Sequence, residues 1–207
     1  MIAQVEGAPR RAVGYWFDDG LAEIGVGLLF LAVAALFAVE GLAPAGSLLA
    51  SFSALGLPLV IIGGMLVVGL AVRTAQERLT YPRTGYVAYP RPGTARRVLA
   101  GVIGAGVSFV LVLLLAARPS LQSALGALQG GALAIVFLAL SLRTGLVRLA
   151  ILGLIALGGG LAATFFNLGA SLGSALAFGA AGTAALLSGA LILVHYLRTT
   201  APPTERA

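Results

Sequence analysis

The chain has no cysteine and no lysine, one histidine and few charged residues of either sign. Without cysteine it forms no disulfide, and thiolate catalysis and cysteine-ligated metal or iron–sulfur sites are excluded. Charged residues make up 10% of the chain and hydrophobic residues 59%, whereas a soluble domain carries about 25% charged residues. The shortage of charge therefore argues against water as the main solvent of this protein.

Long apolar runs occupy most of the 207 residues. About 20 apolar residues in a helix cross a bilayer core of about 30 Å, and a spanning backbone must be paired within helices or a closed barrel. The runs are continuous and rich in Leu, Ala and Gly, which favours helices over alternating barrel strands. We predict an all-α transmembrane bundle with six spans, at about Leu21–Val39, Ser47–Val72, Val98–Ala117, Leu121–Leu142, Leu149–Phe166 and Leu168–Val194.

The arginine distribution predicts the orientation. With the N-terminus inside, the inner segments hold twelve of the thirteen arginines, and the outer segments hold only Arg118. Because basic residues concentrate on the cytoplasmic side, we expect a multi-pass protein of a bacterial inner (plasma) membrane with both termini cytoplasmic. The expected parts are an interfacial segment (1–20), a first transmembrane hairpin (21–72), a basic cytoplasmic loop (73–97), a four-helix transmembrane region (98–194) and a cytoplasmic tail (195–207).

The sixth predicted span has a small residue at every fourth position: Gly169, Gly173, Ala177, Ala181, Ala185 and Gly189. Helices in lipid associate through close contact of small residues. We therefore expect this helix to be thin and to lie centrally in the bundle.

The basic loop contains a doubled Tyr-Pro-Arg-x-Gly motif, which begins at Tyr81 and again at Tyr89. Tyrosines favour the headgroup level, and Arg83 and Arg91 can each bind a phosphate or carboxylate through two parallel hydrogen bonds. Two interpretations stay open: an ordinary interfacial belt, or a surface that binds anionic membrane lipids or a protein partner. Nucleic acid is not expected, since no fold that binds it is recognisable.

Three acidic residues, Asp18, Asp19 and Glu23, lie at the start of the first span. Asp19 and Glu23 are four residues apart, which would place them on one helical face. Our hypothesis is that these carboxylates dock onto Arg83, Arg91 or neighbouring arginines of the loop.

A more specific alternative is that these carboxylates form a metal site or an acid–base pair. The only histidine, His195, is far away in the sequence, so we predict neither a metal nor a cofactor. The sequence also shows no Ser/His/acid constellation and no phosphate-cradling glycine loop.

The segments Asp19-Gly-Leu-Ala-Glu-Ile24 and Thr80-Tyr-Pro-Arg-Thr-Gly-Tyr-Val87 together resemble a group of small, uncharacterised bacterial polytopic membrane proteins. The resemblance covers the N-terminal hairpin and the loop. That group has no assigned activity, so the resemblance implies a membrane location but no catalytic residue.

We therefore expect a non-enzymatic interaction or accessory component that acts through its cytoplasmic loop. The first alternative is a small-solute channel or transporter, which would require a polar-lined cavity near the midplane. The second is a lipid-modifying enzyme, which would require an interfacial pocket that holds Asp19, Glu23 and Arg83 together.

Overall fold

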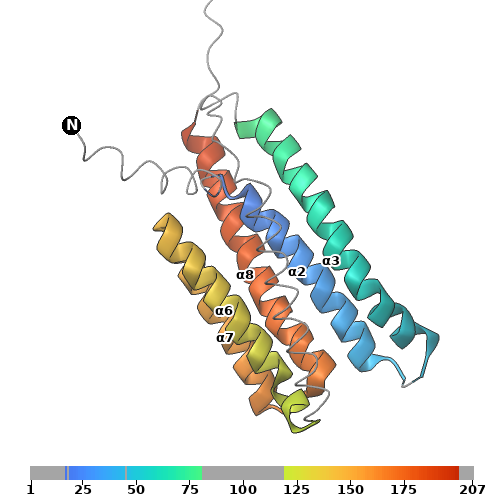
Figure 1. Cartoon of the computed structure of the whole chain (residues 1–207). Helices are drawn as coiled ribbons and strands as arrows, with labels where there is room; N and C mark the ends of the chain where they lie inside the picture. Colours follow the sequence, from blue (N-terminus) through green and yellow to red (C-terminus); the bar gives the residue numbers. More distant parts are fainter. Residues whose placement is uncertain (1–16, 18, 45, 81–118, 201–207) are drawn as a thin grey trace, which may run out of the picture.

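The computed structural model describes residues 17, 19–44, 46–80 and 119–200 (Figure 1). These residues form the helices α2 (Leu21–Leu42), α3 (Leu48–Ala75), α6 (Leu125–Thr144), α7 (Val147–Phe165) and α8 (Gly169–Thr199), with a π-helical turn η2 (Gln76–Thr80) and a 3-10 turn η3 (Pro119–Ala124). The described part contains no strand, so the all-α prediction is confirmed there. Five of its helices are long and apolar enough to cross a membrane.

Each of these five helices corresponds to a predicted span. The main difference is α8, which continues past the predicted end at Val194 to Thr199. The third predicted span, Val98–Ala117, lies outside the described residues. The structure is therefore compatible with a multi-pass membrane protein.

The two ends of the bundle differ in charge. At one end, here called the polar end, α2 and α7 begin and α3, α6 and α8 finish (Figure 1). All described arginines lie at this end: Arg73, Arg78, Arg143, Arg148 and Arg198. The opposite end, here called the far end, carries one described charged residue, Glu40 near the end of α2.

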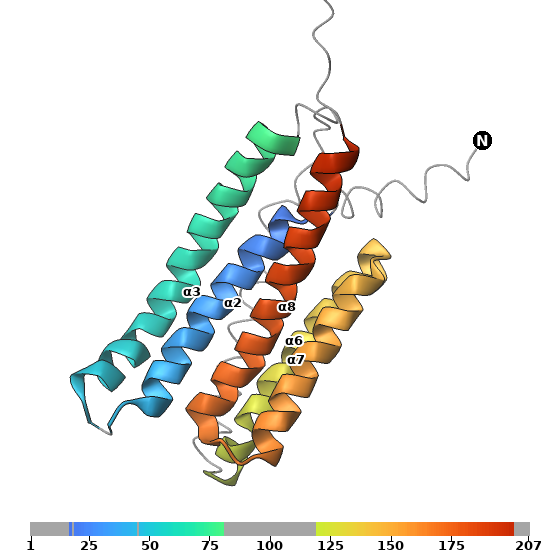
Figure 2. The same cartoon turned by 180° about the vertical axis from the view of Figure 1, so that it is seen from behind.

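Helix α8 lies at the centre of the described bundle, where it packs against α2, α6, α7 and η3 (Figure 2). Its buried residues are all small: Gly173, Ser174, Ala177, Ala181, Gly182, Ala185 and Gly189. A Cβ placed on Gly182 would lie 3.0 Å from the Gly27 carbonyl oxygen of α2. The prediction of a thin, central helix is confirmed, except that Gly169 is exposed and begins the helix instead of packing.

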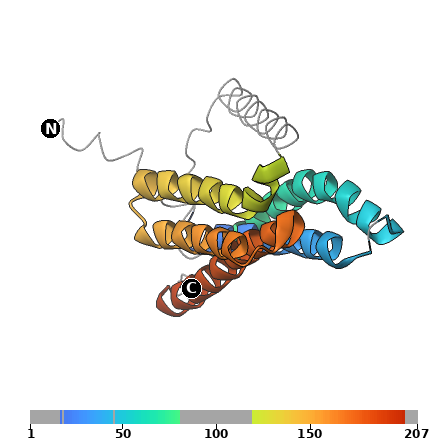
Figure 3. The same ribbon diagram turned by 90° about the horizontal axis from the view of Figure 1, so that it is seen from below.

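Glycine also brings α6 and α7 together, side by side in the end view (Figure 3). A Cβ placed on Gly130 would lie 2.5 Å from the Ala156 carbonyl oxygen. Toward the polar end, Phe137, Leu149, Leu152 and Ala185 form a buried apolar cluster. Thus small residues set the distance between helices, and a few larger ones fill the remaining space.

Helix α3 lies at the edge of the described bundle and packs on α2 and η2. Its apolar side chains are largely exposed, including Leu59, Ile62, Leu66 and Leu70. Such exposure is unfavourable in water and favourable against lipid tails. The outer surface of α3 therefore fits a hydrocarbon environment.

Candidate functional site: two buried carboxylates at the polar end

The first site residue, Asp19, is held just outside α2 by a left-handed glycine. Gly20 has a φ of 73°, and a Cβ at this position would collide with the Gly189 backbone of α8. The position therefore requires glycine both for its backbone angle and for its contact. Because α2 begins only at Leu21, Asp19 does not share a helical face with Glu23, contrary to the prediction.

Asp19 is only 5% exposed and accepts hydrogen bonds from three donors. Its Oδ1 accepts from the Leu21 backbone N–H at 3.0 Å. Its Oδ2 accepts from Gln76 Nε2 at 3.0 Å and from the Thr80 hydroxyl at 3.3 Å. Asp19 thereby connects the start of α2 to the turn η2, which follows α3.

The turn η2 supplies both side-chain donors, since Gln76 and Thr80 are its first and last residues. The Thr80 hydroxyl also lies 3.0 Å from the Gln76 carbonyl oxygen, so its single proton can serve only one acceptor at a time. On α8, the Tyr196 hydroxyl donates to the Thr80 carbonyl oxygen at 3.5 Å. Asp19 and Tyr196 therefore both contact Thr80, the residue that immediately precedes the doubled Tyr-Pro-Arg motif.

Burial raises the pKa of the Asp19 carboxyl above its ordinary value. The hydrogen bonds from Leu21, Gln76 and Thr80 lower this pKa and offset only part of the desolvation. All three bonds run from a donor to the carboxyl oxygens, an arrangement that suits the ionised form. The described hydrogen-bond partners of Asp19 are therefore all neutral donors.

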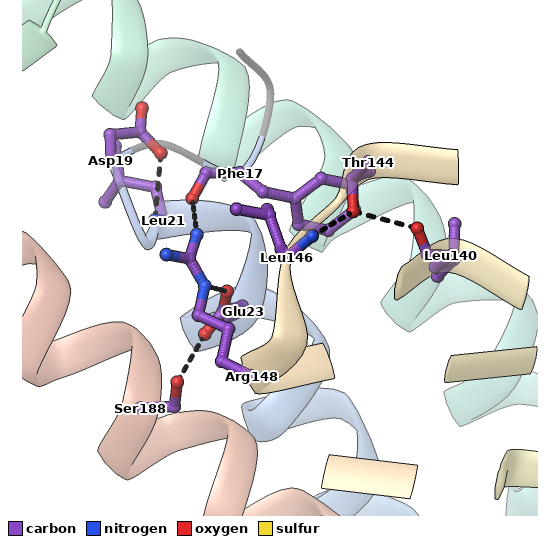
Figure 4. A network of polar contacts seen from close by, with 9 residues as sticks. All are labelled: Phe17, Asp19, Leu21, Glu23, Leu140, Thr144, Leu146, Arg148 and Ser188. Carbon is purple, nitrogen blue, oxygen red and sulfur yellow. Dashed lines mark hydrogen bonds and ion pairs between the residues drawn. The ribbon is translucent and has the colours of Figure 1, made fainter. Parts of the chain in front are cut away.

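Glu23, in the first turn of α2, is buried even more completely, with 2% exposure. Its Oε1 accepts from Arg148 Nε at 2.7 Å, and its Oε2 accepts from the Ser188 hydroxyl at 2.7 Å (Figure 4). The Arg148 Nη2 group donates to the Phe17 carbonyl oxygen. This network joins α2, α7 and α8 with the segment before α2.

The two carboxylates are thus engaged with different partners and do not form a common acid–base pair. Within the described residues, no group of three or more His, Cys, Asp and Glu side chains could hold a metal ion. His195 is exposed near the end of α8 and takes no part in either network. The arrangement is suited to fixing helix ends.

The described bundle also contains two cavities with apolar walls. One, of about 590 Å³, lies between α2 and α3. The other, of about 420 Å³, lies between α3 and α6, with Glu23 as its charged lining residue. Neither cavity offers a polar path through the described part of the bundle.

Of the predicted site residues, Asp19 and Glu23 are buried in these networks. Asp18, Tyr81, Arg83, Tyr89 and Arg91 lie outside the described residues.

Sequence reasoning did not identify four residues of the networks: Gln76, Thr80, Arg148 and Ser188. One signal did exist for Arg148. An acidic residue one turn inside a span requires a partner, and Arg148 is the second residue of α7. The chain matches no family model, and neither the curated proteins nor the solved structures contain a significant match to it.

Proposed function

We propose that the protein is a non-enzymatic interaction or accessory component of the membrane that acts through the polar end of its bundle. The observation that carries this proposal is the engagement of Glu23, whose two carboxyl oxygens each accept a hydrogen bond, one from Arg148 and one from Ser188. Asp19 is likewise engaged by donors from two elements. Carboxylates used in this way hold the helices together and are not presented to a substrate.

The charge distribution supports placing the polar end, with both termini, in the cytoplasm of a bacterial cell. Every described arginine lies there, as the positive-inside bias requires. The chain path also supports six spans. Thr80 lies at the polar end and Pro119 at the far end, which supports our proposal that the apolar run Val98–Ala117 between them is a sixth span.

The interaction surface that we propose is the basic loop, with Tyr81, Arg83, Tyr89 and Arg91 as its contact residues. Its binding partners would be anionic membrane lipids or a protein at the cytoplasmic face. The contacts of Thr80 with Asp19 and Tyr196 support this role, because they give the loop a fixed starting point on the bundle.

The competing functions find less support in the described residues. A small-solute transporter needs polar side chains along a path, whereas both cavities have apolar walls. A lipid-modifying enzyme needs its acidic groups in one pocket, whereas Asp19 and Glu23 are engaged with separate sets of partners.

In-cell photo-crosslinking of the full-length protein tests this proposal. A photoreactive amino acid at position 81 or 89 is expected to give discrete crosslinked species with a partner. The same residue at Phe166, an exposed position at the far end, serves as the control and is expected to give none. The double variant Arg83→Gln/Arg91→Gln should weaken the crosslinks without changing the thermal unfolding temperature.

Two results would contradict the proposal. One is equal crosslinking at positions 81, 89 and 166. The other is saturable uptake of a small solute by proteoliposomes that contain the purified protein, which would favour the transporter.

A further inference from the structure

The apolar groove between α3 and α6 has a volume of about 420 Å³. Its walls include Met65, Val68 and Val72 of α3 and Leu133, Phe137 and Leu140 of α6. The α6 lining residues span seven residue steps, which at about 1.5 Å per residue gives a length of about 10 Å.

The chemistry of the walls helps to identify the occupant. A hydrocarbon chain matches the apolar side chains that line the groove. Gly69 adds to the available space, because a Cβ at this position would meet no atom within 4 Å.

The rim of the groove at the polar end is basic. Each of three walls carries an arginine one helical turn beyond a lining residue: Arg73 follows Gly69 by four positions, Arg143 follows Leu140 by three, and Arg148 precedes Leu152 by four. Residues three or four apart lie on the same helical face. The groove therefore continues from apolar walls to guanidinium groups at its polar end.

The exposed charge at this rim is predominantly positive. Arg143 is exposed, and the Arg148 side chain is 29% exposed. Glu23 is buried and accepts hydrogen bonds from Arg148 and Ser188. The exposed Glu77 forms an ion pair with Arg73, with 2.9 Å between Glu77 Oε1 and Arg73 Nε. Within the described residues, Arg148 uses only two of its five N–H donors, toward Glu23 and Phe17.

We propose that this groove binds an anionic phospholipid of the adjacent leaflet, with one acyl chain between α3 and α6. The phosphate lies at the rim, where it accepts hydrogen bonds from Arg143 and from the remaining N–H groups of Arg148. The site uses none of the residues Tyr81, Arg83, Tyr89 and Arg91, so it stands whether or not these residues bind a protein partner.

Native mass spectrometry of the full-length protein tests the site. The protein is extracted from nanodiscs of phosphatidylcholine with or without phosphatidylglycerol, and the retained lipid is counted. We expect wild type to retain phosphatidylglycerol in preference to phosphatidylcholine. Gly69→Phe should abolish retention by filling the groove. Gly63→Phe is the matched control, because Gly63 also has open space on α3 but does not line the groove.

The charged rim is tested separately with Arg143→Gln. An arginine near an anionic headgroup contributes on the order of 1 kcal/mol, so phosphatidylglycerol should bind about fivefold more weakly. Arg198→Gln, which removes an exposed arginine from the polar end of α8, should leave the lipid preference unchanged. Neither arginine is buried, so both variants are expected to fold.

Several outcomes would overturn the proposal. Equal retention by the Gly69→Phe and Gly63→Phe variants would show that lipid binds elsewhere. A disulfide between cysteines at position 69 and at one of positions 103–106 would show that the chain itself fills the groove. A disulfide-linked dimer of the Gly69→Cys variant would show instead that a second copy fills it.

Discussion

The salt bridge between Glu23 and Arg148 predicts an asymmetry between its two partners. Arg148→Met leaves the Glu23 carboxylate, which is 2% exposed, without a cation. Stranding a buried charge in this way costs about 3–5 kcal/mol. Glu23→Gln leaves Arg148, whose side chain is 29% exposed and can reach water or headgroups. This second change should cost only the loss of charged hydrogen bonds, about 1.5–3 kcal/mol.

The double variant tests whether the stranded carboxylate causes the loss of stability. Adding Glu23→Gln to Arg148→Met removes the stranded charge and should restore about 1–2 kcal/mol relative to Arg148→Met alone. The measurement is unfolding of the full-length protein by SDS in mixed micelles, followed by helical circular dichroism. Arg198→Met serves as the control, since it removes an exposed arginine at the same end and should change stability by less than about 0.5 kcal/mol.

Two results would refute this account of the salt bridge. The first is an Arg148→Met variant as stable as Arg198→Met, which would mean that Glu23 is not desolvated. The second is a double variant less stable than Arg148→Met, which would mean that the carboxylate contributes through something other than its pairing with Arg148.

Two further predictions concern helix contact and pH. Gly130→Ala should destabilise the bundle by more than about 1 kcal/mol in the same unfolding assay, because its Cβ would lie 2.5 Å from the Ala156 carbonyl oxygen. Gly158→Ala, at a position with open space, should be neutral or stabilising. For Asp19, the raised pKa means that the folded state binds more protons than the unfolded state. Its contribution to stability should therefore be full below about pH 4 and decline as the pH rises through the folded pKa, a decline that Asp19→Asn should lack.

These two predictions can fail independently. Equal stability of the Gly130→Ala and Gly158→Ala variants would mean that α6 and α7 can separate without cost. A pH profile of Asp19→Asn that parallels wild type from pH 4 upward would mean that the decline originates from another group.

The sequence predicted the helices well, because the membrane imposes a simple rule on them. A run such as Leu21–Leu42 must be helical wherever it spans lipid, whatever it packs against. The central position of α8 was also predictable, because its span consists mostly of small residues, which allow close neighbours on several sides.

The partners of the acidic residues could not be predicted in the same way. Glu23 and Arg148 are 125 positions apart, and their contact depends on how α2 and α7 are arranged around α8. For Asp19 the difficulty was local. Gly20 has a left-handed backbone conformation, and α2 begins only after it, at Leu21. Asp19 therefore lies outside the helix, and its spacing of four residues from Glu23 does not place the two side chains on one helical face.

The salt bridge also has a consequence for synthesis of the protein. Glu23 leaves the ribosome 125 residues before Arg148 and 165 before Ser188. Because the chain is made from the N-terminus, α2 meets the insertion machinery while its carboxylate has neither partner. The nascent protein therefore carries an unneutralised acid at the membrane surface until Arg148 of α7 is made, and a product truncated before α7 lacks the cation that neutralises it.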